Sequence, residues 1–195
     1  MAGGVFYLFS DKNNFTRSDI NAKPSGKISL RPDEREILYL ASLAPCGHNT
    51  QPWLVNYIAP YHWIIGNDKS KWLPAVDPAQ RETILSIGAF MQNLEYAASH
   101  FGYACRWNII AANPEEKNIA EIKLIKTGSV PGYNIEKIKL RRTLRSGYSN
   151  DVLKKADLNY LTNEDTDLFH YFPNTAKEYQ WLNEQTIEAN NTSLS

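Results

Sequence analysis

The run Ala44–Trp53, with the sequence APCGHNTQPW, gathers residue types that suit the binding of a planar heterocycle. Asn49 and Gln51 carry amides that donate and accept hydrogen bonds. Pro45 and Gly47 free backbone groups from regular pairing, and the final tryptophan adds an aromatic wall. The same composition is typical of a turn that ends a helix, in which Asn49 caps its own backbone. Composition alone favours the turn.

A second candidate is a basic cluster, in which five cations fall within nine residues: Lys137, Lys139, Arg141, Arg142 and Arg145. Guanidinium groups bind phosphate through two parallel hydrogen bonds, and the hydroxyl of Thr143 adds a third donor. On charge alone, a solvated helix face explains the cluster equally well. A nucleic-acid surface would need interleaved aromatic side chains, which this stretch lacks.

Other chemistry is disfavoured. Cys46 and His48 could begin a metal site, but further ligands at suitable spacing are lacking, so we predict no metal. We assign no catalytic acid, base or nucleophile. A lone bridge between Cys46 and Cys105 is left open, and a disulfide framework is excluded. With 21 basic and 21 acidic side chains, the chain has no net field that would concentrate nucleic acid or a membrane surface. Small-molecule ligands are favoured.

The first 29 residues form a predicted flexible leader. Its apolar run, residues 3–9, is too short to span a bilayer and lacks the basic start of a signal peptide. Two interpretations stay open: a frayed end, or the tail of a longer hydrophobic segment encoded upstream of Met1. The protein is expected to be cytoplasmic as written, and exported or membrane-anchored if Met1 is not the true start.

Ordered structure is expected from Leu30. Pro32, followed by two acids, predicts the start of a helix with an apolar stripe. Two strands should follow it, over 53–58 and 61–65. A longer helix should open at Pro78 and end at Gly102.

Inside that longer helix, Gly88 and Ala89 predict the close approach of another backbone. Further strands are expected over 103–110 and 119–126, joined through Asn113-Pro114. An internal boundary is predicted at 127–133. Beyond it we expect one helix over 176–187 and a disordered tail over 190–195.

The run Ala44–Trp53 resembles the APSxxNxQPW signature of the flavin-dependent nitroreductase family. The stretch from Asp77 to Leu94 is similar to the DPxxRE…GAxxxNL pattern of its Acg-like branch. Together these matches cover about residues 31 to 107. Cys46 stands where the family commonly has serine, so the resemblance implies backbone contacts to the flavin there and not a hydroxyl contact.

The basic cluster is similar to the IxxRRSxR start of a nitroreductase subunit, where arginines hold the FMN phosphate. Because it follows the signature, the resemblance implies two fused halves. The expected fold class is α+β: a nitroreductase-like first half over 30–128, and the start of a second half over 132–189. The chain looks truncated in that second half relative to full-length relatives.

The resemblance implies an FMN-binding oxidoreductase that reduces small nitro- or quinone-like substrates with NAD(P)H, as a homodimer. It implies these FMN-binding residues: Pro45, Cys46, Gly47, Asn49, Gln51, Arg141, Arg142, Thr143 and Arg145. The flavin carries the chemistry in such enzymes, so the lack of a catalytic triad is expected. The alternative is a flavin-sequestering protein or a non-catalytic remnant of the same fold.

Overall fold

The protein is represented by a computed structural model that describes residues 30–127, 132–144, 147, 149, 151–162 and 169–193. The chain divides into two compact units, one ending at Thr143 and the other beginning at Leu144. This division lies further along the chain than the predicted boundary, because Ile138 packs into the core of the first unit. The predicted leader and Arg145 lie outside the described residues.

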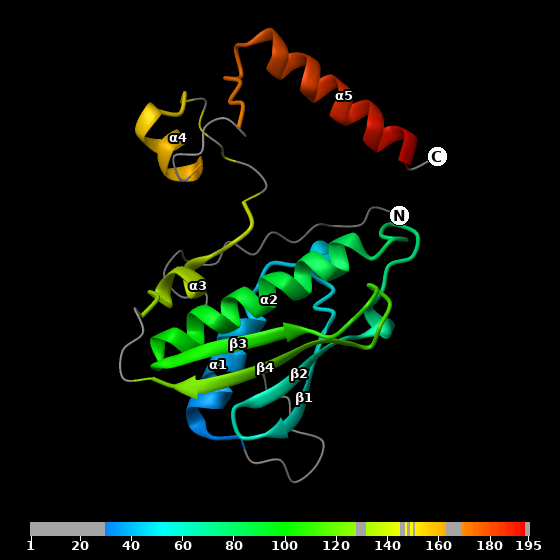
Figure 1. Ribbon diagram of the computed structural model, residues 1–195. Coiled ribbons are helices and arrows are strands. Elements are labelled where there is room, and N and C mark those ends of the chain that lie inside the picture. Colours follow the sequence, from blue (N-terminus) through cyan, green and yellow to red (C-terminus); the bar gives the residue numbers. More distant parts are fainter. Residues whose placement is uncertain are drawn as a thin grey trace, which may run out of the picture. The chain divides into compact units, whose positions relative to one another are not determined.

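A four-stranded antiparallel sheet forms the base of the first unit, in the order β1-β2-β4-β3 (Figure 1). Its strands are β1 (Trp53–Ala59), β2 (His62–Asn67), β3 (Tyr103–Ile109) and β4 (Asn118–Lys126). The register places Trp63 of β2 opposite Ile122 of β4, which in turn lies opposite Trp107 of β3. The strands match the predicted ranges to within two residues, and the α+β class is confirmed.

Two helices, α1 (Pro32–Ser42) and α2 (Arg81–His100), lie on one face of this sheet and pack on each other (Figure 1). Helix α1 begins at Pro32, as predicted. Helix α2 begins three residues later than the predicted start at Pro78. The reason is that Gln80, the residue before the helix, has a left-handed φ of 56°, which separates Pro78 from the helical backbone. The Asp77 carboxylate accepts hydrogen bonds from the N–H and hydroxyl of Thr83, at 2.9 and 3.0 Å, and so stabilises the first turn.

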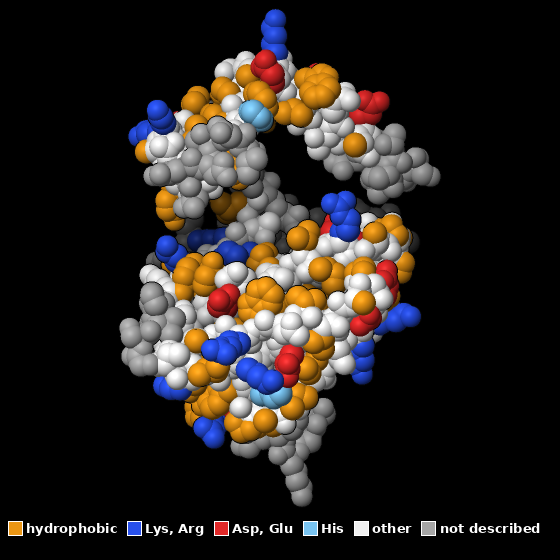
Figure 2. Space-filling model, viewed as in Figure 1, with side chains coloured by type: hydrophobic (Ala, Val, Ile, Leu, Met, Phe, Trp, Pro, Cys, Tyr) orange, Lys and Arg blue, Asp and Glu red, His pale blue; other side chains and the backbone are white. Residues whose placement is uncertain are grey.

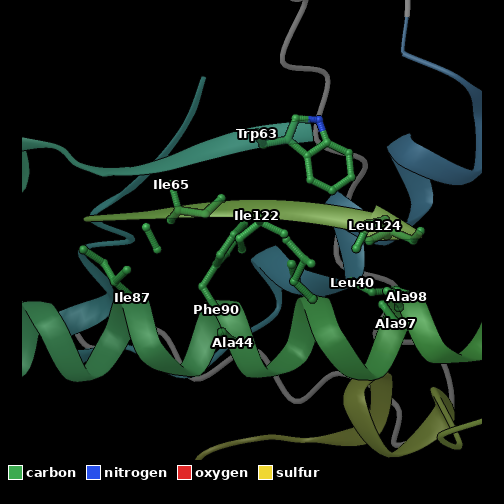
Figure 3. Packing of buried hydrophobic residues seen from close by; sticks show 14 of the residues in the cluster. Leu40, Ala44, Trp63, Ile65, Ile87, Phe90, Ala97, Ala98, Ile122 and Leu124 are labelled. Atoms are coloured by element: carbon green, nitrogen blue, oxygen red, sulfur yellow. The ribbon is translucent and has the colours of Figure 1, made fainter. Parts of the chain in front are cut away.

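The core lies between α2 and the sheet. Figure 3 shows Ile87 and Phe90 rising from α2 towards Ile65 and Ile122 of the strands. Leu94, one turn further along α2, is fully buried, and the neighbouring Met91 is half-buried. Burial of the long helix against an antiparallel sheet is therefore confirmed.

The prediction that another backbone packs closely at Gly88 was wrong. This glycine lies on the exposed side of α2, and a Cβ built on it would meet no atom within 4 Å. The sequence signal failed because glycine in a helix marks close approach only when it faces a neighbour, and here the core-facing positions are Ile87 and Phe90.

Gly88→Ala should therefore raise the free energy of unfolding by about 0.5–1 kcal/mol, since alanine loses less backbone entropy on folding than glycine. The matched control is Gly102→Ala. Gly102 holds a left-handed φ of 76° and should resist substitution. Urea unfolding of both variants checks the pair. Destabilisation by Gly88→Ala would mean that this side of α2 is covered in solution.

A carboxylate shared by two tyrosines joins the start of α1 to the sheet. Asp33 accepts hydrogen bonds from the hydroxyl of Tyr103 at 2.5 Å and from that of Tyr61 at 2.9 and 3.1 Å. Burial alone would raise the pKa of Asp33, but these hydroxyls and the N–H of Glu34 stabilise the charged form, so its pKa lies below the ordinary value. The charged carboxylate thus contributes to stability at neutral pH.

Asp33→Asn should lower the free energy of unfolding at pH 7 by about 1–3 kcal/mol, because the bonds from both tyrosines lose their charged acceptor. The native pKa is depressed, so the wild-type advantage exists above the unfolded value of about 4 and fades as the pH falls through the native pKa. Thermal unfolding of both proteins between pH 7 and pH 2 should show converging midpoints. A constant difference across that range would show that the Asp33 charge is not what stabilises the contact.

The second unit contains α4 (Lys155–Thr162) and α5 (Lys177–Ser193). Helix α5 covers residues 177–187 of the helix predicted over 176–187, and it continues to Ser193, within the stretch predicted to be disordered. Many hydrophobic side chains of this unit are exposed (Figure 2). Trp181 and Tyr160 are among them. An open groove lined by Phe172, Trp181 and Leu182 borders α5.

Among the described residues, no helix is both long enough and apolar enough to cross a membrane. Both cysteines are free thiols, so the bridge left open by the sequence is not formed. Burial raises the pKa of Cys105 to about 12, which keeps it protonated and unreactive.

Candidate functional site

The signature run forms a tight turn between α1 and β1. Its centre is the short 3-10 helix η1 (Gly47–Asn49). His48, Asn49 and Gln51 hold left-handed backbone angles, with φ of 52°, 57° and 51°. Histidine and asparagine adopt such angles more readily than most residues other than glycine, so Gln51 carries most of the strain, on the order of 1 kcal/mol. The turn therefore stores strain, which is typical of segments that present groups to a ligand.

Contacts with the first turns of α2 hold this turn in place. The N–H of Gly47 donates to Ser86 Oγ at 3.2 Å, and that hydroxyl donates to the carbonyl of Glu82 at 2.6 Å. His48 Nδ1 lies 3.4 Å from Glu82 Oε2. A Cβ at position 47 would lie 2.3 Å from the same carboxylate oxygen, so a larger residue there would require the Glu82 side chain to move. The sequence analysis missed Glu82 and Ser86 as supports of the turn.

The two amides singled out from the sequence point away from the protein. The side chains of Asn49 and Gln51 are exposed and have no hydrogen-bond partner within the described part of the chain. Pro45 is exposed and Cys46 is half-buried. The turn thus presents amide donors and acceptors on its outer side, next to Cys46 and Gly47.

The basic cluster begins in helix α3 (Glu136–Leu140), as the helix-face interpretation of its charges expected. Ile138 is buried and anchors this helix in the core. Lys139 Nζ lies 3.2 Å from Glu136 Oε1, so this lysine is paired on the surface. Arg142 and Thr143, which follow the helix, are exposed.

Arg141 joins the two sequence motifs. Its Nη2 donates a hydrogen bond to the carbonyl of Leu43 at 3.2 Å, across 98 positions of sequence. Leu43 directly precedes the signature run. The structure therefore brings Arg141 to the start of that run. Arg142 and Thr143 lie next to Arg141 in the chain.

Residues of the stretch from Asp77 to Leu94 help to position the run Ala44–Trp53. Asn93, from the GAxxxNL match, donates through Nδ2 to the carbonyl of Leu40 near the end of α1, at 3.4 Å. Asp77, from the DPxxRE match, is the buried carboxylate that binds Thr83. Burial alone would raise the pKa of Asp77, but the hydrogen bonds from Thr83 and neighbouring N–H groups hold it below the ordinary value. It acts as a helix cap.

A small polar hollow lies against the turn, lined by Gly47, Thr50, Lys71, Leu73, Asp77, Glu82 and Thr83. Its volume is about 10 Å³, which is room for about one water molecule. A flavin ring cannot enter a hollow of this size. The described residues contain no cluster of His, Cys, Asp and Glu side chains able to hold a metal ion.

No protein-family profile matches the chain. A curated relative, the probable NAD(P)H nitroreductase PigM of Serratia sp., is 28% identical over 116 residues. Over this stretch the chain is similar to a nitroreductase. The match covers 56% of this chain and 32% of the relative, so the chain spans about a third of the curated relative that it matches.

Two solved structures are also similar to this chain. A nitroreductase-like protein from Streptococcus mutans has a TM-score of 0.41 at 14% identity, covering 60% of this chain and 89% of that one. A nitroreductase family protein from Clostridium difficile has a TM-score of 0.40 at 19% identity, covering 66% of this chain and 90% of that one.

Proposed function

We propose that this chain is a nitroreductase-family flavoprotein of the Acg-like branch. It would bind FMN and reduce small electron-poor substrates, such as nitro compounds or quinones, with electrons from NAD(P)H. The hydrogen bond from Arg141 to Leu43 carries the proposal. It joins the arginine segment that would bind the FMN phosphate to the signature turn that would bind the flavin ring, within one folded unit. The similarity to a probable NAD(P)H nitroreductase supports it.

The residues at the turn fit the polar edge of a flavin ring. Asn49 and Gln51 would bind that edge, since their amides are exposed and offer both donors and acceptors. The backbone of Pro45, Cys46 and Gly47 would pack along the ring. The strain in the turn favours this role, because the left-handed angles hold the amides in place before a ligand arrives.

The basic segment fits the phosphate end. Arg142, Thr143 and Arg145 would bind the phosphate oxygens, and Arg142 and Thr143 are exposed and therefore accessible. FMN, when bound, supplies the redox chemistry by alternating reduction and reoxidation. The contribution of the protein is to bind, to orient and to exclude water.

A second copy of the chain would complete the site. The hollow at the turn is too small to cover a flavin. Large apolar side chains of strand β3 remain open, with Trp107 53% exposed and Ile109 52% exposed. We therefore propose a homodimer in which these surfaces are covered. The open turn equally favours the second candidate function, a flavin-sequestering protein or a remnant without turnover.

The colour of the purified full-length chain, followed under NAD(P)H without oxygen, tests these proposals. A yellow protein that NAD(P)H bleaches, and that a nitroaromatic compound or quinone reoxidises, is the expected result. A yellow protein that stays yellow would support sequestration, and a chain that takes up no added FMN would support the remnant. Light scattering should give twice the mass of one chain, and a monomer with no dye-binding apolar surface would contradict the dimer.

A further inference from the structure

We infer that Arg141 is a positioning residue that fixes the signature turn, and that the phosphate is bound by its neighbour Arg142 instead. The inference rests on the proposed function and assigns different roles to two adjacent arginines. Its starting point is their different exposure: Arg141 is half-buried and directed to a backbone carbonyl, whereas Arg142 is exposed.

The two side chains have different surroundings. Arg141 follows helix α3, and its φ of −59° and ψ of 130° end the helical backbone. Its Nη2 donates to the Leu43 carbonyl at 3.2 Å, whereas the side chain of Arg142 is exposed. Arg142 is therefore the more accessible of the two guanidinium groups for a phosphate that arrives from solvent.

The carbonyl of Leu43 needs a donor from outside its own helix. The last carbonyls of a helix have no partner within it. Leu43 is only 6% exposed, so water has little access to it, and Pro45 just beyond it has no N–H to offer. The last turn of α1 also lacks a basic residue of its own. Arg141 supplies both the hydrogen bond and a positive charge at the negative end of the helix.

The hydrogen bond between Arg141 and Leu43 helps to fix the position of the signature turn. Only three residues separate Leu43 from Gly47, and the Gly47 N–H is held at its far side by Ser86. Arg141 is itself anchored, because Ile138 in the preceding turn of α3 is buried in the core. Loss of the guanidinium would release the near end of the turn and leave the far end fixed. The amides of Asn49 and Gln51 would then lose their common orientation.

Comparison of FMN with riboflavin, which lacks the phosphate, separates the two roles. Arg141→Ala should lower the affinities for FMN and for riboflavin by the same factor, about tenfold, because the turn that binds the ring is disturbed. Arg142→Ala should lower the affinity for FMN by at least the same factor and leave the affinity for riboflavin unchanged. Arg141→Lys should retain most of the affinity, since a lysine keeps the charge and one donor for the Leu43 carbonyl.

Fluorescence titrations of the full-length chain with both flavins provide the test, together with amide hydrogen exchange. In Arg141→Ala, the amides of Ala44 and Gly47 should exchange faster, and in Arg142→Ala they should not. A purely structural arginine would lower the midpoint of unfolding without changing flavin affinity at temperatures where the variant is folded, and that result overturns the inference. So does a loss of FMN affinity with riboflavin affinity intact in Arg141→Ala.

The exchange measurement keeps this inference separate from the proposed function. A wild-type chain that binds neither flavin would overturn the proposed function. Faster exchange at Ala44 and Gly47 in Arg141→Ala would still support the tie to the turn. Unchanged exchange at those amides would overturn that tie, whatever the flavins do.

Discussion

Leu94→Ala should destabilise the first unit by about 2–5 kcal/mol, the range for a buried leucine cut back to alanine. Leu94 is fully buried in the core between α2 and the sheet. The substitution removes apolar contacts and leaves a cavity that the packed helix and strands cannot fill. Because the free energy of unfolding of a domain is itself only about 5–15 kcal/mol, this one change should be evident in any unfolding curve.

The matched control is Leu85→Ala in the same helix. Leu85 is 72% exposed, so its truncation should change stability by no more than about 0.5 kcal/mol. Both variants keep the helix propensity of the wild type nearly unchanged, and the difference between them therefore measures burial alone. Chemical denaturation followed by tryptophan fluorescence gives both values. Equal effects at the two sites would contradict the packing of α2 against the sheet.

Arg142→Ala should weaken FMN binding by roughly 10- to 150-fold, the equivalent of about 1.5–3 kcal/mol for a hydrogen bond to a charged group. Arg142 is exposed and carries a two-pronged donor suited to a phosphate. The effect should shrink as salt is added, since the contact is between charges at the surface.

Lys137→Ala is the control for Arg142→Ala. Lys137 is also exposed and basic, but it lies in helix α3, outside the arginine pair that resembles a phosphate motif. Its loss removes the same charge from the cluster and should leave FMN affinity within about twofold, as expected for an interaction that salt largely screens. Flavin fluorescence titration of both variants is the measurement. Equal losses would mean that the cluster acts only through its net charge, as a solvated helix face.

Local patterns predicted the elements that position the site. Pro32 marked the start of α1, and the apolar spacing through Leu94 marked the buried face of α2. These signals work because helix starts and apolar stripes depend on residues close together in the chain. Gly102 was also informative, since its left-handed angle is one that glycine readily adopts.

Contacts between distant segments had no comparable signal. Nothing near Arg141 in the chain indicates that its guanidinium meets the carbonyl of Leu43, 98 positions away. The left-handed angle of Gln51 was equally hidden, because most non-glycine residues avoid it and only the folded turn imposes it. For the same reason Gly88 was misinterpreted: its type was visible in the sequence, but the side of α2 on which it lies was not.

Hydrogen exchange of the full-length chain, with and without FMN, tests most directly whether the signature turn and the basic segment form one binding site. FMN should slow exchange at both places, in the turn between Ala44 and Gln51 and at Arg141 to Thr143. These segments are joined by the Arg141 contact, so a single ligand that spans them must protect both together. Protection of only one segment, or of neither at saturating FMN, would contradict a shared flavin site.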